Sequence, residues 1–259
     1  METNRPFSII TGGSSGIGRE LAKIFIQEGY DVLIAADRDV DEACAQLGVD
    51  GVTANLATPE GVKALVERIE QIGRVPDAIV LNAGVGVGGP FLETSLDSEI
   101  EMIELNCTAV VRLAKLLLPA MSSRGSGRVL ITSSIAATMP APFEAVYGAT
   151  KAFDLSLAEG LREELRETGV TVTALQPGPT DTAFFERAGL QDTKVGSGDK
   201  DDPAKVARQG FDAMMAGKDK VYAGSLKTRA EGIASELLPE TVKAKQHAKQ
   251  AKPGSGQPR

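Results

Sequence analysis

Residues Phe7–Gly18 read FSIITGGSSGIG, a short apolar run followed by a glycine-rich turn. The run FSIIT is rich in β-branched and aromatic side chains, which predicts a buried strand. A helical pattern, Arg19–Glu28, follows at once. The glycines let the backbone turn sharply, and the N-terminal amides of the helix then point at one spot. The stretch therefore predicts a strand–turn–helix unit that binds an anion such as a phosphate group.

The glycine spacing is G-x-x-x-G-x-G, which differs from the general dinucleotide fingerprint G-x-G-x-x-G. The turn nevertheless lies between the first strand and the first helix, where the mechanism requires it. We therefore expect this turn to bind the phosphates of a dinucleotide. Its expected contact residues are Gly12, Ser14, Ser15, Gly16, Ile17 and Gly18.

An acidic residue is expected about 20 positions further on, at the end of the second strand, to bind the adenine ribose. Asp37 lies 19 residues after Gly18. A carboxylate there favours NAD, because it would repel the 2′-phosphate of NADP. Arg38 follows immediately and could pair with that phosphate, so NADP stays open, as does a turn-capping role for Asp37.

Short apolar runs alternate with longer helical patterns along the chain. Continuous apolar runs suit parallel strands that are covered on both faces. The pattern predicts one Rossmann-like α/β domain over residues 1–238, a doubly wound parallel sheet of about seven strands with helices on both faces. The further runs are Val32–Ala36, Gly51–Ala54, Ala78–Asn82, Arg128–Ser133, Val170–Gln176 and Lys220–Gly224.

Helix boundaries can be placed from capping residues and prolines. Thr58 and Pro59 begin one helix, Asp202 and Pro203 begin another, and a third runs from Tyr147 to before Gly169. The pattern Asp97–Leu118 predicts a helix that stops near Pro119. Residues 183–202 are expected to form a substrate loop with a lid function. Residues 239–259 are basic and are expected to form a flexible tail.

Composition excludes several classes of function. The net charge of −7 argues against a nucleic-acid surface, and no apolar run is long enough to span a bilayer. The N-terminus has no signal-peptide layout, so we expect a cytoplasmic protein. The two cysteines are far apart and give no disulfide framework. The only histidine, His247, lies in the basic tail, so neither a histidine-based triad nor a metal site is expected.

The sequence YGATK places Tyr147 and Lys151 four residues apart at the start of a helical pattern. Residues at that spacing share one helix face. A nearby ammonium lowers the pKa of a phenol, which would make the tyrosine a usable acid or base. The same spacing also occurs in surface pairs without a function, so this motif does not decide the matter by itself.

Taken together, these residues resemble the short-chain dehydrogenase/reductase family. The matching motifs follow the family's order from about Phe7 to Tyr222. The resemblance implies an NAD(P)-dependent oxidoreductase that interconverts an alcohol and a carbonyl group. The motifs are TGGSSGIG (11–18), LNAG (81–84), ELNCTA around Asn106, ITSS (131–134), YGATK (147–151) and PGPTDT (177–182).

The resemblance also implies roles for single residues. Tyr147 would be the general acid/base, and Lys151 would bind the nicotinamide ribose and lower the phenol's pKa. Ser134 would bind the substrate oxygen and is preferred to Ser133 because it lies 13 residues before the tyrosine. Asn106 would place a water molecule that links the lysine to solvent.

The remaining cofactor contacts are also implied by the resemblance. Many relatives carry an aspartate near the adenine where this chain has Asn55, followed by Leu56, so the strength of that contact is in doubt. An amide carbonyl can still accept from the adenine amino group. The other expected contacts are Asn82, Ala83 and Gly84 on the adenosine side, and Pro177, Gly178, Thr180 and Thr182 at the nicotinamide end.

The substrate is less well defined by the sequence. The candidate pocket residues are mostly apolar, which favours a hydrophobic ketone, aldehyde or secondary alcohol. A nucleotide-sensing protein without turnover, and an epimerase or dehydratase, are kept as alternatives. The family resemblance also implies a homodimer or homotetramer. The candidate pocket residues are Val85, Val87, Ile135, Met139, Phe143, Phe184 and Phe185.

Overall fold

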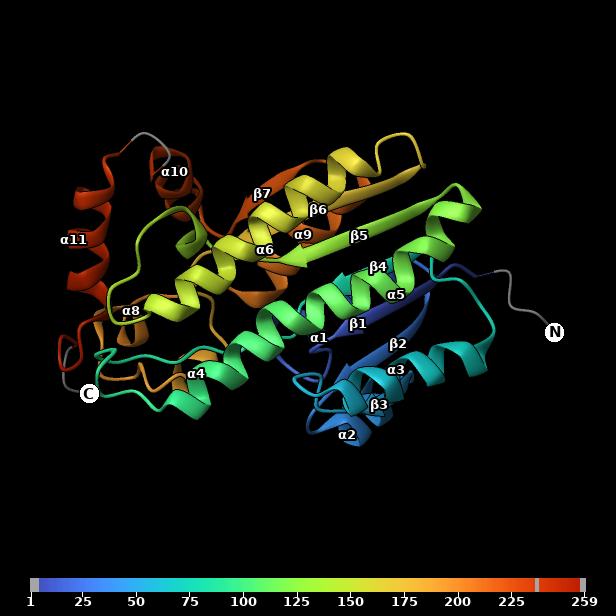
Figure 1. The fold of residues 1–259 in the computed structure, drawn as a ribbon, viewed down its shortest axis with the longest axis horizontal. Helices are drawn as coiled ribbons and strands as arrows, with labels where there is room; N and C mark the ends of the chain where they lie inside the picture. The colour runs from blue at the N-terminus through green and yellow to red at the C-terminus, as the bar shows by residue number, and fades with distance from the viewer. Residues whose placement is uncertain (1–4, 236–237, 257–259) are drawn as a thin grey trace.

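The computed structural model describes residues 5–235 and 238–256, and it contains a seven-stranded parallel sheet. The strand order β3-β2-β1-β4-β5-β6-β7 reverses direction between β1 and β4 (Figure 1). This confirms the predicted doubly wound α/β fold. The strands are β1 (Phe7–Thr11), β2 (Asp31–Ala36), β3 (Asp50–Thr53), β4 (Ala78–Leu81), β5 (Gly127–Thr132), β6 (Val170–Pro177) and β7 (Lys220–Ala223).

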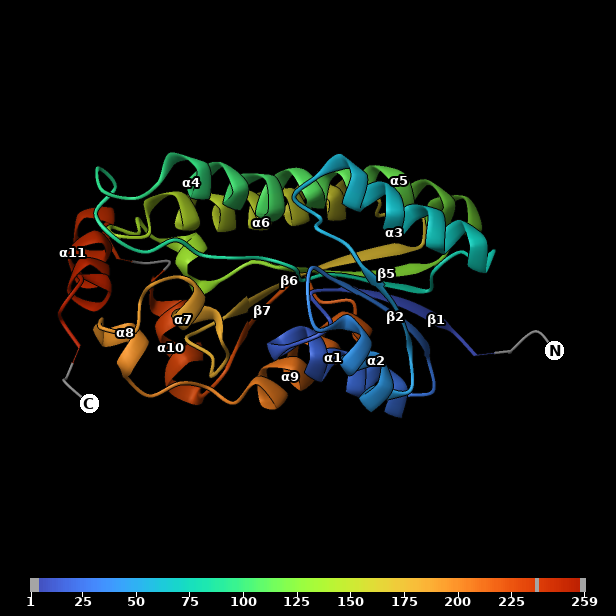
Figure 2. The same cartoon turned by 90° about the horizontal axis from the view of Figure 1, so that it is seen from below.

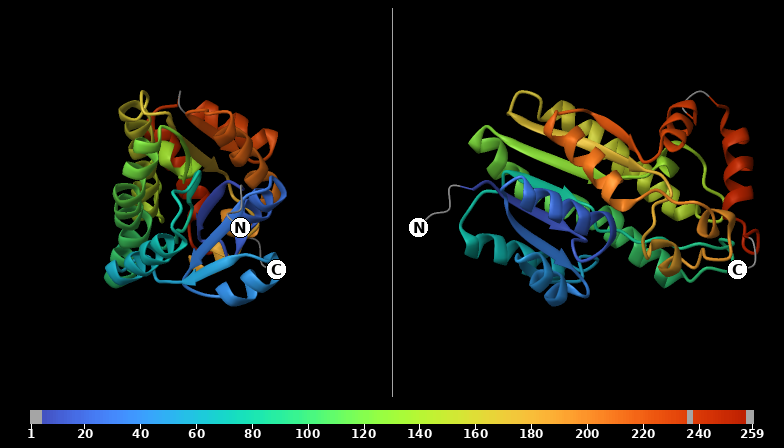
Figure 3. Two further views of the ribbon diagram at one scale, coloured as in Figure 1. Left: turned by 90° about the vertical axis from the view of Figure 1, so that its right-hand side faces the viewer. Right: turned by 180° about the vertical axis from the view of Figure 1, so that it is seen from behind.

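Helices cover both faces of this sheet (Figure 2 and Figure 3). Successive strand residues point to opposite faces, so Ile9 packs in the core on one side and Ile10 in the core on the other. This is why the strands read as continuous apolar runs. One face carries α3 (Pro59–Ile72), α4 (Leu96–Ile103), α5 (Ala109–Arg124) and α6 (Ala145–Glu164); the other carries α1 (Gly16–Gln27), α2 (Val40–Leu47), α9 (Pro203–Met215) and α10 (Leu226–Ser235).

The helix predicted for Asp97–Leu118 has different boundaries in the structure. It consists of α4, a π-helical segment η1 (Glu104–Thr108) and α5, which continues past Pro119 to Arg124. A proline inside a helix removes one backbone donor, which would otherwise bond the carbonyl four residues earlier. Pro119 and Lys115 both lie on the exposed face of α5, where water can satisfy that carbonyl. The predicted starts at Thr58 and Asp202 are confirmed, because both side chains cap a helix.

The C-terminal segment differs from the expected flexible tail. Residues 240–251 form α11, which packs against α8 (Lys194–Ser197), and Ala251 is fully buried. The backbone N–H groups of Gly254 and Gly256 then donate to Asp192, at 2.8 and 2.7 Å. The segment is rich in lysine, alanine and glutamine, which are good helix formers, so a basic composition did not by itself indicate a flexible tail.

The expected substrate loop, residues 183–202, contains two short helices, α7 (Phe184–Arg187) and α8. Figure 1 shows α8, α10 and α11 gathered at one end of the molecule, beyond the carboxyl ends of the strands. None of the helices in the described residues is long and apolar enough to cross a membrane.

Candidate active site

A cavity of about 1450 Å³ opens at the carboxyl ends of the strands, beside the point where the strand order reverses. Parallel α/β sheets bind their ligands at this position. The structure brings nearly all of the predicted site residues into the wall of this cavity. They are Gly12, Ser14, Ser15, Gly16, Ile17, Asp37, Arg38, Asn55, Leu56, Asn82, Ala83, Gly84, Ser134, Tyr147, Lys151, Pro177, Gly178, Thr180 and Thr182.

The glycine-rich turn lines the cavity and leads directly into the start of α1. Gly12 and Gly16 have φ values of +67° and +54°, which a residue with a side chain adopts only under strain. Ser15 precedes α1, yet its side chain makes no capping hydrogen bond, and the first turn holds no acidic residue. The helix amides are therefore available to a phosphate group.

Gly18 does not line the cavity, although it was predicted to contact the cofactor. A Cβ at this position would lie 2.2 Å from the carbonyl oxygen of Gly12. The absence of a side chain lets α1 pack closely against the turn, so Gly18 supports the shape of the turn without lining the cavity.

Asp37 and Arg38 form an ion pair at the end of β2. Nε and Nη2 of Arg38 donate to Asp37 Oδ2 at 2.9 and 2.6 Å, and both side chains are about half exposed. The hydrogen bond from Arg38 lowers the pKa of the Asp37 carboxyl below its ordinary value, and Arg187 on α7 adds a small effect in the same direction. This end of the cavity therefore presents a carboxylate that is already partly neutralised.

Lys151 is a buried cation at the centre of the site. Its side chain is 6% exposed, and Nζ donates to the carbonyl oxygen of Thr132 at 2.9 Å and to Asp154 Oδ2 at 3.0 Å. Asp154 was not predicted. It is buried one turn further along α6, and its Oδ1 has no partner among the described residues. A buried ammonium requires such compensation, because it has lost its water.

Tyr147 lies one turn before Lys151 on the same helix, as the sequence spacing predicted. Burial is the largest influence and raises the pKa of the Tyr147 phenol, whereas the charge of Lys151 lowers it. The lysine thus acts in the expected direction, but the pKa of Tyr147 stays above its ordinary value. Burial works to lower the pKa of Lys151, yet the charges of Asp154 and Tyr147 raise it overall, so the lysine remains protonated.

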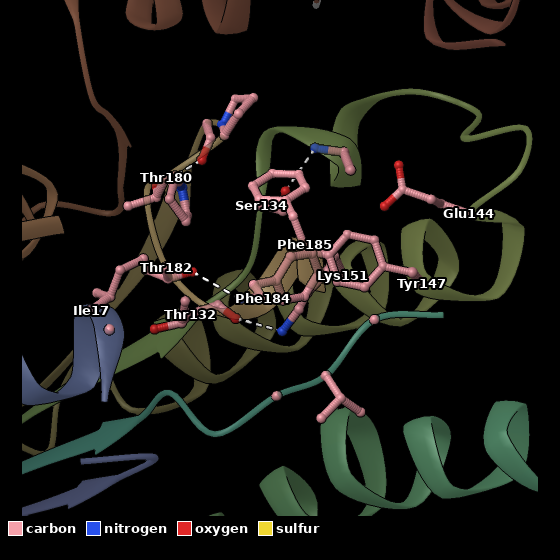
Figure 4. Close-up of a pocket in the computed structure, with 18 of the residues that line it drawn as sticks. Ile17, Thr132, Ser134, Glu144, Tyr147, Lys151, Thr180, Thr182, Phe184 and Phe185 are labelled. Atoms are coloured by element: carbon pink, nitrogen blue, oxygen red, sulfur yellow. Dashed lines mark hydrogen bonds between the residues drawn. The ribbon is translucent and has the colours of Figure 1, made fainter. Parts of the chain in front are cut away.

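The two serines after β5 have different surroundings. Ser133 is buried and its hydroxyl donates to the carbonyl oxygen of Lys151 at 2.7 Å, so it fastens α6 to the sheet. Ser134 lines the cavity, and its Oγ accepts from the Ala136 N–H at 3.1 Å (Figure 4). Ser133 also lines the cavity, but its hydroxyl is engaged with the Lys151 carbonyl, so Ser134 remains the serine expected to face a substrate.

Asn106 is fully buried in η1 and does not line the cavity. Its Oδ1 accepts from the Val85 N–H at 3.0 Å. Its Nδ2 donates to the Val85 carbonyl at 2.9 Å and to Thr150 Oγ1 at 3.0 Å. The side chain therefore joins the loop after β4 to helices η1 and α6.

The substrate side of the cavity has an apolar wall. Val85, Val87, Ile135, Met139, Phe184 and Phe185 line it as predicted. The ring centroids of Phe184 and Tyr147 lie 5.3 Å apart. Phe143 was also predicted here, but it does not line the cavity. Its φ is +68°, and its carbonyl oxygen accepts from the Gly89 N–H at 2.8 Å.

Another part of the cavity wall is polar and was missed by the sequence analysis. Glu144 precedes α6, and α11 contributes Lys243, Gln246, His247 and Gln250. The Nε2 atom of His247 lies 3.1 Å from Glu144 Oε2. No local sequence signal joins residues 103 positions apart, so only the folded chain reveals this wall. Within the described residues, no group of three or more histidine, cysteine or acidic side chains could bind a metal ion.

Comparison with known proteins identifies one family of related sequences. A family model for short chain dehydrogenases matches residues 7–192. The uncharacterized oxidoreductase YvrD of Bacillus subtilis is 34% identical over 67% of this chain and 68% of its own. The uncharacterized oxidoreductase YbbO of Escherichia coli K12 is 31% identical over 90% of this chain and 91% of its own.

A solved structure extends the similarity to three dimensions. A short-chain dehydrogenase from Sphingobium yanoikuyae, in complex with NADPH, superposes with a TM-score of 0.77. It is 29% identical and covers 84% of this chain and 87% of its own. The family match spans well over half of the chain and includes the glycine-rich turn and the Tyr147–Lys151 pair. The protein therefore belongs to the short-chain dehydrogenase/reductase family of oxidoreductases.

Proposed function

We propose that this protein interconverts a secondary alcohol and a ketone, or an aldehyde, by NAD(P)-dependent hydride transfer, with Tyr147 as general acid/base. One observation carries the proposal. Ser134, Tyr147 and Lys151 lie in the wall of the same cavity as the uncapped N-terminus of α1. Relatives named as oxidoreductases, and a neighbour solved with NADPH, support it.

The cavity fits a nicotinamide dinucleotide in its chemistry. The amides at the start of α1 would bind the pyrophosphate, where no side chain or acidic residue competes for them. Asp37 and Arg38 would contact the adenine ribose, and Lys151 the nicotinamide ribose. When bound, the cofactor supplies or accepts the hydride.

The protein's own residues would manage the proton and the charge on the substrate oxygen. In carbonyl reduction the Tyr147 phenol would give its proton to that oxygen, and in alcohol oxidation the phenolate would take it back. The Ser134 hydroxyl would donate a hydrogen bond to the same oxygen as negative charge develops on it. Lys151 would stabilise the phenolate, because a nearby cation favours the charged form.

The first prediction concerns the phenol. Tyr147→Phe keeps the ring but removes the proton donor, so we expect kcat/KM to fall about 10²- to 10⁴-fold while the affinity for NADH changes little. The rate would be measured with the ketone that the wild-type enzyme reduces fastest from a panel of aliphatic and aromatic ketones.

Tyr30→Phe is the matched control, because Tyr30 packs against Phe25 and does not line the cavity. We expect this variant to keep the wild-type rate. Full activity in Tyr147→Phe would rule out the proposed acid/base role.

The choice between NAD and NADP depends on the Asp37–Arg38 pair. The carboxylate favours a free ribose hydroxyl and opposes a 2′-phosphate, whereas Arg38 favours the phosphate. Arg38 already binds the carboxylate in the structure, so each residue weakens the other's effect. We propose that NAD is preferred and that NADP is also accepted.

The second prediction tests this balance with NADH and NADPH titrations followed by nicotinamide fluorescence. The chain contains no tryptophan, so the protein background is low. Asp37→Ala should raise the ratio of NADPH affinity to NADH affinity about tenfold, because it removes a carboxylate that repels the 2′-phosphate. Arg38→Ala should lower this ratio by a similar factor, because it removes the cation that would bind that phosphate. An unchanged affinity ratio in both variants would contradict this assignment.

We also propose that the protein associates with a second copy through the face formed by α4, α5 and α6. These helices lie side by side on one face of the sheet (Figure 2). Their exposed apolar side chains include Ile100 (50% exposed), Leu116 (54%) and Phe153 (40%). Apolar side chains gathered on one face commonly mark an interface. Val110 on α5 is buried in the core and does not contribute to this surface.

The third prediction follows from this surface. Size-exclusion chromatography with light scattering should give a dimer or tetramer for the wild type. Leu116→Lys combined with Phe153→Lys should shift the mass toward the monomer, because two charges would be desolvated at the interface. Leu226→Lys, at an exposed position on the opposite face, serves as the control and should not change the mass. A monomeric wild type would refute the proposed interface.

A further inference from the structure

Glu144 places a buried carboxylate beside the catalytic tyrosine. The residue is 6% exposed, precedes α6 directly and lines the cavity. Figure 4 shows its carboxylate on the same side of the site as the Tyr147 ring. The proposed hydride transfer does not use this side chain, so its position requires another explanation.

The carboxylate has only one protein partner among the described residues. His247 Nε2 lies 3.1 Å from Oε2, and the structure gives no hydrogen bond to Oε1. An ionised carboxylate can accept about four hydrogen bonds, and a buried one is costly when those bonds are not made. Oε1 therefore retains hydrogen-bonding capacity toward the cavity.

His247 is fixed in place by the packing of α11. Lys243, one turn earlier, donates from Nζ to the Thr138 carbonyl at 2.8 Å and pairs with Glu240 at 2.6 Å. The side chains of His247 and Lys243 are 13% and 6% exposed. The helix is thus fastened to the segment that follows Ser134, and it aims His247 at Glu144. Lys243 is the lysine that α11 contributes to the cavity wall, and it is already paired with Glu240.

The electrostatic effect of Glu144 argues against a purely catalytic role. Its charge raises the pKa of the Tyr147 phenol, in the same direction as burial. In alcohol oxidation, where Tyr147 would act as the phenolate, this charge works against the tyrosine. A substrate group that donates a hydrogen bond to Glu144 would satisfy the carboxylate and offset its charge.

We propose that Glu144 is a specificity-determining residue that accepts a hydrogen bond from a hydroxyl or ammonium group of the substrate, close to the reacting carbon. His247 is the positioning residue that holds the carboxylate for this contact. The apolar wall with Phe184 and Phe185 would take the hydrocarbon part. The inference rests on the proposed function and names its substrate class, a hydroxy or amino alcohol and the corresponding ketone with an apolar remainder.

The test compares three alcohols with one skeleton: 1-phenylpropan-1-ol, 1-phenylpropane-1,2-diol and 2-amino-1-phenylpropan-1-ol. They carry hydrogen, hydroxyl or ammonium on the carbon next to the carbinol. Calorimetric titration of the enzyme saturated with NADH gives the three dissociation constants without turnover, because an alcohol cannot be oxidised by a reduced cofactor. We expect the diol, the amino alcohol or both to bind at least about tenfold more tightly than the unsubstituted alcohol.

Variants of Glu144 separate the two donor groups. Glu144→Ala should remove the advantage of both substituted alcohols. Glu144→Gln should remove the advantage of the amino alcohol but keep part of that of the diol, because an amide oxygen accepts a hydrogen bond without carrying charge. His247→Ala should reduce the tighter binding of the diol and of the amino alcohol, but less than Glu144→Ala does. Glu163→Gln, at an exposed position near the end of the same helix, is the control and should leave all three affinities unchanged.

Two results would overturn the inference. One is equal binding of the three alcohols to the wild type, including no binding of any. The other is a preference that persists in Glu144→Ala. Failure of the proposed function is recognised separately, by a lack of NADH and NADPH binding or of any hydride transfer to ketones. In that case the same titrations on the enzyme without cofactor still report whether Glu144 selects the donor group.

Discussion

The burial of the Lys151 ammonium is the constraint on which the rest of the site depends. A buried cation must be compensated, and the compensation comes from the end of β5 through Thr132 and from α6 through Asp154. Together with the hydrogen bond from Ser133 to the Lys151 carbonyl, these contacts fix α6 against the sheet. The fixed helix then sets the position of Tyr147, one turn away. Asp154 shares the ammonium with the phenol, so it also limits how far the lysine can lower the phenol's pKa.

The same construction brings the proposed cofactor site and the proposed substrate site into one cavity. The glycine-rich turn and α1 supply backbone dipoles at one end, and the Ser134–Tyr147–Lys151 group lies at the other. Both ends meet because parallel strands bring their carboxyl ends to one edge of the sheet. Helix α11 lines the same cavity from the far end of the sequence. Just after the helix, the backbone N–H groups of Gly254 and Gly256 donate to Asp192 and tie this segment to residues 183–202.

Features encoded locally were predictable from the sequence. Apolar runs marked all seven strands, Thr58 and Asp202 marked helix starts, and the spacing of Tyr147 and Lys151 placed them on one helix face. Features that depend on long-range packing were not predictable. The Glu144–His247 pair, the order of α11 and the burial of Asp154 each depend on contacts that the folded chain creates. The predicted helix end at Pro119 was wrong because a proline ends a helix less readily when the carbonyl that loses its donor, here that of Lys115, is exposed to water.

The coupling of Lys151 to Tyr147 can be measured directly by ultraviolet titration of tyrosinate. The chain contains three tyrosines and no tryptophan, so the difference between the wild type and Tyr147→Phe isolates one phenol. The titrations would be confined to the pH range in which circular dichroism shows an intact fold. Our account predicts that Lys151→Met moves the Tyr147 transition to higher pH, because the phenolate loses its cation, and that Asp154→Asn moves it to lower pH. A Tyr147 transition that stays in place or moves to lower pH in Lys151→Met would contradict it.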